Sequence, residues 1–108
     1  FEQGDIAEIQ QQLHGFRASL DAHFTLEEQV HFPALHGLRP AFQPELEELI
    51  REHVRFREEL QRIDASLRAI GAEGSAADLL VAFRDLSASL RRHEEREERL
   101  LARAGEAP

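Results

Sequence analysis

Two histidines are each followed, four residues later, by a glutamate, and these pairs are the side chains best suited to chemistry. The pairs are His23 with Glu27 and His93 with Glu97. Residues four apart in an α-helix lie on the same face, so both members of each pair point in one direction. Imidazole nitrogens and carboxylate oxygens are ligands that suit iron, manganese and zinc. The spacing therefore favours a metal site.

The first pair lies on a helix face that is otherwise apolar. Its neighbours on that face, at steps of three and four residues, are Leu13, Phe16, Leu20, Val30 and Ala34. Burying an unpaired carboxylate is costly, so such a group is normally paired, hydrogen-bonded or bound to a metal. We therefore expect Glu27 to have a partner inside the protein.

Two later stretches show the same pattern of apolar residues interrupted by histidine. One stripe consists of Leu46, Leu49, His53, Phe56, Leu60, Ile63, Leu67 and Ile70. The other consists of Leu79, Phe83, Leu86, Leu90, His93, Glu97 and Leu100. Both follow helical periodicity without a slip, so each predicts an amphipathic helix with a histidine on its buried face.

Three long helices are therefore expected, over Ile6 to about His36, about Pro44 to Ile70, and from there to about Ala104. Pro33 predicts a kink or an early end in the first helix. The connectors are the proline-containing stretch 37–44 and the turn 71–75, where Ser75 with Asp78 resembles a capping box. Short connectors predict an all-α, up-down antiparallel helical bundle, with residues 1–108 as one domain.

Counting residues from the turns, at about 1.5 Å per residue, places the polar side chains at a common depth. Glu27 and His53 each lie about nine residues from the first turn, and His93 is level with His53 across the second. The candidate metal ligands are His23, Glu27, His53, His93 and Glu97. The alternative is a buried polar network that holds no metal.

Composition narrows the classes of function. The 108 residues carry a formal net charge of -8 and include no cysteine. An acidic chain argues against DNA, RNA or an anionic membrane as the main partner, and a chain without cysteine has neither disulfides nor thiolate metal sites. No apolar stretch approaches the roughly 20 residues needed to cross a bilayer. We expect a cytoplasmic protein with nitrogen and oxygen metal ligands.

The string HFTLEEQVHFPAL, with His53 in REHVRFREEL and His93 in RRHEEREERLL, resembles the hemerythrin-like family, also called HHE cation-binding domains. The likeness extends from about Leu13 to Leu101. It implies a four-helix bundle around a non-haem di-iron site bridged by carboxylates. By this resemblance the five candidate residues are the iron ligands, and both glutamates are the bridges.

Two features depart from the family pattern. The family's first helix, which normally contributes a histidine, has no counterpart before Ile6, and His14 is about half a turn out of phase with His23. Either an upstream helix or another chain, as in a homodimer, would complete the bundle. Oxygen carriers also have a second histidine four residues after the one at His53, where this chain has Arg57. The single-histidine version resembles the branch linked to iron-sulfur repair and nitric oxide chemistry.

The expected function is that of a non-haem iron protein, di-iron when complete, that binds or senses O2 or NO or handles iron; zinc and manganese are alternatives. A second hypothesis is a repair protein or an enzyme that reduces NO or peroxide, and a third is a metal-free helical interaction module. No residue is an evident nucleophile, so catalysis stays open. We expect Arg57 to pair with a carboxylate beside the site.

The remaining polar residues near these helix faces are expected to be solvated. They are Glu28, Glu94, Glu95 and Glu98, with His31 and His36 near the first turn. The alternative for the glutamates is a hydrogen bond to a metal ligand.

Overall fold

The structure is a computed structural model that describes the backbone of residues 3–69 and 76–105 and the side chains of residues 7–69 and 79–105. Every element in these ranges is a helix, and the described residues include no strand. The predicted all-α class is confirmed. Within the same residues, no helix is both long and apolar enough to cross a membrane.

The first helical rod is continuous over three elements, α1 (Gln3–Leu26), the π-helix η1 (Glu27–His31) and α2 (Phe32–Leu38). Arg39 leaves the helical conformation with φ -139° and ψ 81°, and the 3-10 turn η2 (Pro40–Phe42) follows. The second rod is α3 (Gln43–Ala69), and the third is α4 (Ala76–Ala104). The predicted turn 71–75, with Ser75, and the side chain of Asp78 lie outside the described residues.

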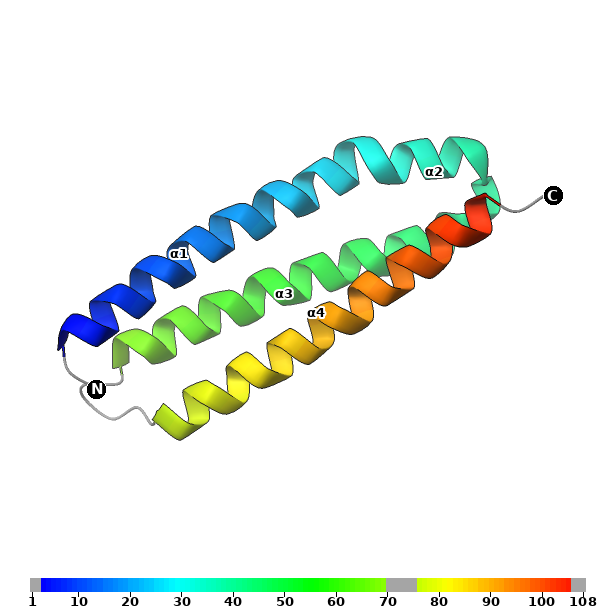
Figure 1. The fold of residues 1–108 in the computed structure, drawn as a ribbon. Coiled ribbons are helices and arrows are strands. Elements are labelled where there is room, and N and C mark those ends of the chain that lie inside the picture. Colours follow the sequence, from blue (N-terminus) through cyan, green and yellow to red (C-terminus); the bar gives the residue numbers. More distant parts are fainter. Residues whose placement is uncertain (1–2, 70–75, 106–108) are drawn as a thin grey trace.

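The central rod is α3. The chain runs along α1 and α2, reverses at η2 and returns along α3, and α4 then runs beside α3 to the end where α2 lies (Figure 1). Helix α3 contacts α1, α2 and α4, and α2 also contacts α4. A side chain on the buried face of α3 can therefore meet groups from both other rods.

Pro33 was expected to cause a kink or an early end, and the early end is wrong because the helix continues past it, after a π-helical segment. The N–H of Phe32 donates to the carbonyl of Glu27, five residues back, which is the wider π pattern. Proline cannot donate its own bond, and its ring crowds the carbonyl four residues earlier in a regular α-helix. The wider turn places one extra residue just before this proline, and the helix continues to Leu38.

The extra residue also changes which side chains face inward. Glu27 is buried, and the next buried residue is Phe32, five positions later, followed by Leu35. The prediction that Val30 and Ala34 continue the buried stripe is wrong, since Val30 is 53% exposed and Ala34 is exposed as well. Regular helical periodicity fails here because the π-helix rotates every later residue around the axis.

The stripes predicted for the other two rods are confirmed where their residues are described. In α3 the buried residues are Leu46, Leu49, His53, Phe56, Leu60, Ile63 and Leu67, while Ile70 lies outside the described residues. In α4 the buried members are Leu79, Leu86, His93 and Leu100, with Phe83, Leu90 and Glu97 partly buried.

The buried apolar residues form two clusters. One contains Leu13, Phe24, Phe56, Leu60, Ile63, Leu67, Leu79 and Leu86. The other contains Phe32, Leu35, Phe42, Leu46, Leu49 and Leu100. Along α3, His53 falls between Leu49 of the second cluster and Phe56 of the first. The polar residues thus occupy a layer between two apolar ones.

Candidate metal centre

Four of the predicted ligands meet in the polar layer. One nitrogen or oxygen atom from each of Glu27, His53, His93 and Glu97 lies within 4.8 Å of every other. Glu27, His53 and His93 are 3%, 0% and 2% exposed, and Glu97 is partly buried. These residues come from η1, α3 and α4, so all three rods contribute to one interior site.

The atoms that converge are lone-pair donors. The Nε2 atoms of His53 and His93 lie 3.1 Å apart. Glu27 Oε1 is 3.4 Å from His53 Nε2, and Glu97 Oε1 is 3.9 Å from the same nitrogen and in close contact with His93 Nε2. Neither Oε1 atom accepts a hydrogen bond from the described residues. Such a set is stable only when a cation, either a proton or a metal ion, lies among the donors.

The outer nitrogen of each histidine is held by a further carboxylate. His53 Nδ1 donates to Glu28 Oε2 at 3.0 Å, and His93 Nδ1 donates to Glu52 Oε1 at 2.8 Å. A carboxylate accepts these hydrogen bonds, so Nδ1 of each ring carries a proton, and in the neutral ring the lone pair of Nε2 faces the centre. Histidines that bind metals almost always have this arrangement.

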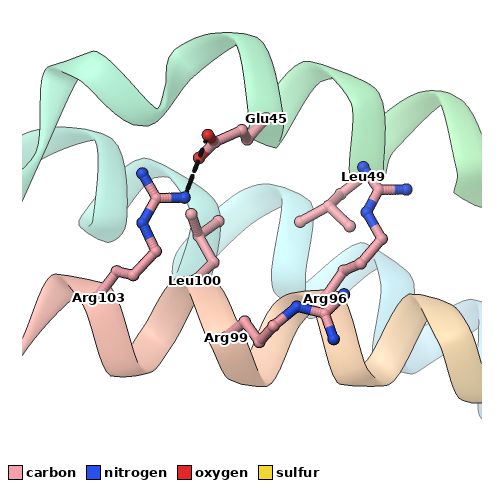
Figure 2. A pocket seen from close by; sticks show the side chains of 6 residues that line it. All are labelled: Glu45, Leu49, Arg96, Arg99, Leu100 and Arg103. Carbon is pink, nitrogen blue, oxygen red and sulfur yellow. Dashed lines mark hydrogen bonds and ion pairs between the residues drawn. The ribbon is translucent and has the colours of Figure 1, made fainter.

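Arginines in turn pair with these carboxylates. Arg57 donates to Glu28 Oε2 at 3.3 Å and to Asp21 Oδ1 at 2.7 Å. Arg96 donates to Glu52 Oε2. Figure 2 shows Arg96 extending from α4 towards α3, in a pocket that also contains the linked pair Arg103 and Glu45. The expected pairing of Arg57 with a carboxylate beside the site is present.

Aromatic rings cover the histidines on the side of the first apolar cluster. Phe24 stacks on His53 with ring centroids 3.9 Å apart and an angle of 10° between the planes. Phe56 lies edge-on to His93 at 5.2 Å and 90°. These rings keep water from the imidazole faces, and the low local dielectric strengthens the electrostatic interactions of the layer.

The environment moves the pKa values of the ionisable groups apart. Burial lowers the pKa of His53, but the carboxylates of Glu27, Glu97 and Glu28 outweigh it and raise this pKa to about 9. Burial likewise opposes a rise in the pKa of His93, which Glu97 and Glu52 nevertheless produce.

The pKa values of the carboxylates of Glu27 and Glu97 shift in opposite directions. Burial, with Glu97 nearby, raises the pKa of Glu27 despite the contact with His53. Burial acts to raise the pKa of Glu97 too, but its contacts with the His53 and His93 rings bring this pKa well below its usual range. Two carboxylates in one site separate in this way because they cannot both remain ionised without compensating charge.

His23 is the one predicted ligand outside the interior. Its side chain is 56% exposed, and its Nε2 lies 3.3 Å from Glu27 Oε1 at the edge of the centre. The buried face of α1 passes through Phe24 instead, which packs between α1 and α3. Periodicity could not separate these two positions because they lie three and four residues after Leu20, and both steps fit a helical stripe.

Two carboxylates play a larger part than the sequence indicated. Glu28 was expected on a solvated face but is partly buried against His53, while Glu94, Glu95 and Glu98 are exposed as expected. Glu52 was not predicted at all. Its depth, level with His93 when counted from the turns, was the only signal available.

A groove borders the centre. It has a volume of about 400 Å³, and both Glu27 and Glu97 line it together with His23. The rest of its lining is mostly apolar and includes Phe32, Leu35 and Leu100. The carboxylate side of the centre is therefore the side nearest to solvent.

Comparisons with known proteins identify the family. No curated protein and no solved structure matches the chain. The hemerythrin HHE cation binding domain matches over residues 1–104. This match covers nearly the whole chain and agrees with a His/Glu group that could hold a metal ion. The chain therefore belongs to the hemerythrin HHE cation-binding domain family.

Proposed function

We propose that this protein binds non-haem iron through Glu27, His53, His93 and Glu97, with His23 as a further ligand at the edge. The observation that carries the proposal is the convergence, in a buried layer, of the Nε2 atoms of two imidazoles and two carboxylate oxygens that accept no hydrogen bond from the described residues. An N/O donor set without thiolates suits iron, manganese or zinc. Two carboxylates also balance the charge of one divalent ion.

The family resemblance favours two iron ions. Glu27 and Glu97 approach the centre from different rods, as carboxylates shared by two ions would, and His23 adds a donor next to Glu27. The family's four-helix bundle supplies additional ligands from another helix. The four interior donors alone suffice for one ion, so the number of ions per chain is a measurable test of this part of the proposal.

The ligand we propose is a diatomic molecule, O2 or NO. When bound, iron supplies an open coordination position and redox chemistry that amino acids lack. The chain contributes a mostly apolar groove beside Glu27 and Glu97, which favours entry of a small uncharged molecule over ions. The protein binds or senses this molecule or handles iron, and we place it in the cytoplasm.

A catalytic role is the second candidate. Arg57 stands where oxygen carriers have a further histidine and, as a permanent cation, cannot ligate. Its guanidinium is bound to Glu28 and Asp21. A metal with fewer protein ligands has more positions for reacting molecules, which favours repair of iron-sulfur clusters or reduction of NO or peroxide. Turnover with NO or peroxide by the iron-loaded protein would support this role over simple binding.

Metal analysis tests the proposal directly. Protein purified after iron-supplemented growth should contain one or two iron ions per chain, and the double variant Glu27→Ala/Glu97→Ala should contain almost none. The matched control is Glu94→Ala/Glu98→Ala, which changes two exposed glutamates and should keep its iron. No transition metal in the wild type, or equal iron in both variants, would defeat the proposal and favour a metal-free interaction module.

A homodimer is the proposed oligomeric state. The groove beside the metal centre has Leu38 and Leu101 in its lining, and both are exposed large apolar residues. A second copy that covered this groove would bury them and supply the helix that the family fold adds. Light scattering should then give twice the mass of the chain. A monomer at micromolar concentration would contradict this state without affecting the metal proposal.

A further inference from the structure

We propose that Arg57 and Arg96 are positioning residues of the metal centre, each acting through a carboxylate that holds one histidine ligand. The inference rests on the proposed metal binding. Neither arginine touches the converging donor atoms. Each instead contacts a glutamate, Glu28 or Glu52, that is itself hydrogen-bonded to one of the histidines. Both side chains are only partly exposed, so their pairs are screened less than those on the open surface.

Arg57 contacts both groups that fix the ring of His53. Its Nη2 donates to Glu28 Oε2 at 3.3 Å, and Glu28 accepts from His53 Nδ1 at 3.0 Å. The guanidinium also lies over the ring of Phe24, 5.5 Å from its centroid, and Phe24 stacks on His53. Asp21, which accepts from Arg57 Nε at 2.7 Å, holds the arginine itself in place. The edge and one face of His53 therefore both depend on Arg57.

Arg96 has the corresponding place beside His93. It donates to Glu52 Oε2, while the other oxygen of Glu52 accepts from His93 Nδ1 at 2.8 Å. Arg55 lies 3.8 Å from the same Glu52 oxygen. Arg96 belongs to α4 and Glu52 to α3, so this contact joins the two rods that carry the histidines.

These contacts give the two arginines a role that differs from that of a metal ligand, because they orient the carboxylates that hold the histidines. A carboxylate on Nδ1 fixes the tautomer and raises the basicity of Nε2, but only while it points at the ring. A guanidinium holds the carboxylate in that orientation through charge-assisted hydrogen bonds. At Arg57, the protein therefore has an orienting group at the position where a carrier has a further ligand.

Cobalt binding provides a test that does not depend on activity. We would measure Co²⁺ affinity by competition with a chelator, together with the visible absorption of bound Co²⁺, for the wild type, Arg57→Gln and Arg96→Gln. Both variants should bind about 10- to 100-fold more weakly, with a changed cobalt spectrum. Arg51→Gln is the matched control, since among the described residues Arg51 pairs with Glu48 on its own helix and with no group of the metal centre. Its affinity and spectrum should equal those of the wild type.

A double-variant cycle shows whether Arg57 acts through Glu28. If it does, Glu28→Gln/Arg57→Gln should bind Co²⁺ about as weakly as Glu28→Gln alone. Arg57→Lys, which keeps the charge but not the fork, should recover part of the affinity. Circular dichroism of each metal-free variant confirms that it is folded.

The outcomes separate this inference from the proposed function. Wild-type protein that binds no metal would defeat both. Wild-type binding with Arg57→Gln and Arg96→Gln equal to Arg51→Gln would overturn only the positioning role. Fully additive losses in the cycle would also overturn it, because they would show that Arg57 does not act through Glu28.

Discussion

Helix α3 carries two fully buried residues of opposite kind, Leu67 in the first apolar cluster and His53 in the polar layer. Leu67 is surrounded by apolar side chains, so its contribution depends on the volume it fills and on the apolar area removed from water. His53 is surrounded by carboxylates, and its contribution depends on charge balance. Equal burial thus has different consequences in the two layers.

The difference shows why the polar layer needs a cation. Glu27, Glu97 and Glu28 face His53, and without a positive charge among them the buried carboxylates would repel one another. A proton can supply that charge in the metal-free protein, and a metal ion can replace it. Substitutions in the two layers should separate these effects.

The largest expected effect comes from His53→Leu. This variant fills similar volume, yet it should retain almost no iron because one of two imidazole donors is lost. Its metal-free form should also unfold with a free energy about 3–5 kcal/mol lower, since the buried carboxylates lose their partner. Elemental analysis and urea unfolding measure the two effects. Wild-type iron content in this variant would show that the site is elsewhere.

Leu67→Ala should lower the free energy of unfolding by about 3 kcal/mol, within the usual 2–5 for such truncations, because it leaves a cavity. The folded protein should keep its iron, since Leu67 belongs to the apolar cluster and not to the polar layer. Leu67→Met is the control and should cost less than about 1.5 kcal/mol. Loss of iron from folded Leu67→Ala would mean that the two layers are not independent.

The smallest expected effect is the response of the metal-free protein to pH. The folded state holds a proton on His53 up to about pH 9, against an ordinary pKa of 6.5. The native state therefore binds more protons than the unfolded state in this window, and stability should fall as pH rises from 6.5 to 9, by at most about 3 kcal/mol. Metal affinity should rise over the same range because protons compete less.

Urea unfolding of chelator-treated protein at pH 6.5 and pH 9 measures this slope. His53→Leu provides the control and should show a smaller slope, because the group that takes up the proton is gone. Stability that rises with pH would contradict the assignment of the proton to His53.

Much of the site followed from helical periodicity. The stripes of α3 and α4 are local patterns, and counting residues from each turn was enough to place His53 and His93 at one level. The depth of a residue in the bundle depends on the helical rise per residue and on the length of the connectors, and tertiary packing changes both only a little. The same reasoning was less successful in α1, where the choice between His23 and Phe24 required knowing which face α3 would cover.

The sequence by itself determined the all-helical class, the buried faces of α3 and α4, and the donor types available to a metal. Only the tertiary structure decided the turn at η1, which moves Phe32 inward and Val30 outward, and the pairing of Glu28 and Glu52 with the histidines. The physical reason is that the positions of side chains along one helix follow from the local geometry of that helix, which its own sequence determines. Contacts between rods depend on their relative rotation, which one extra residue in a turn is enough to change.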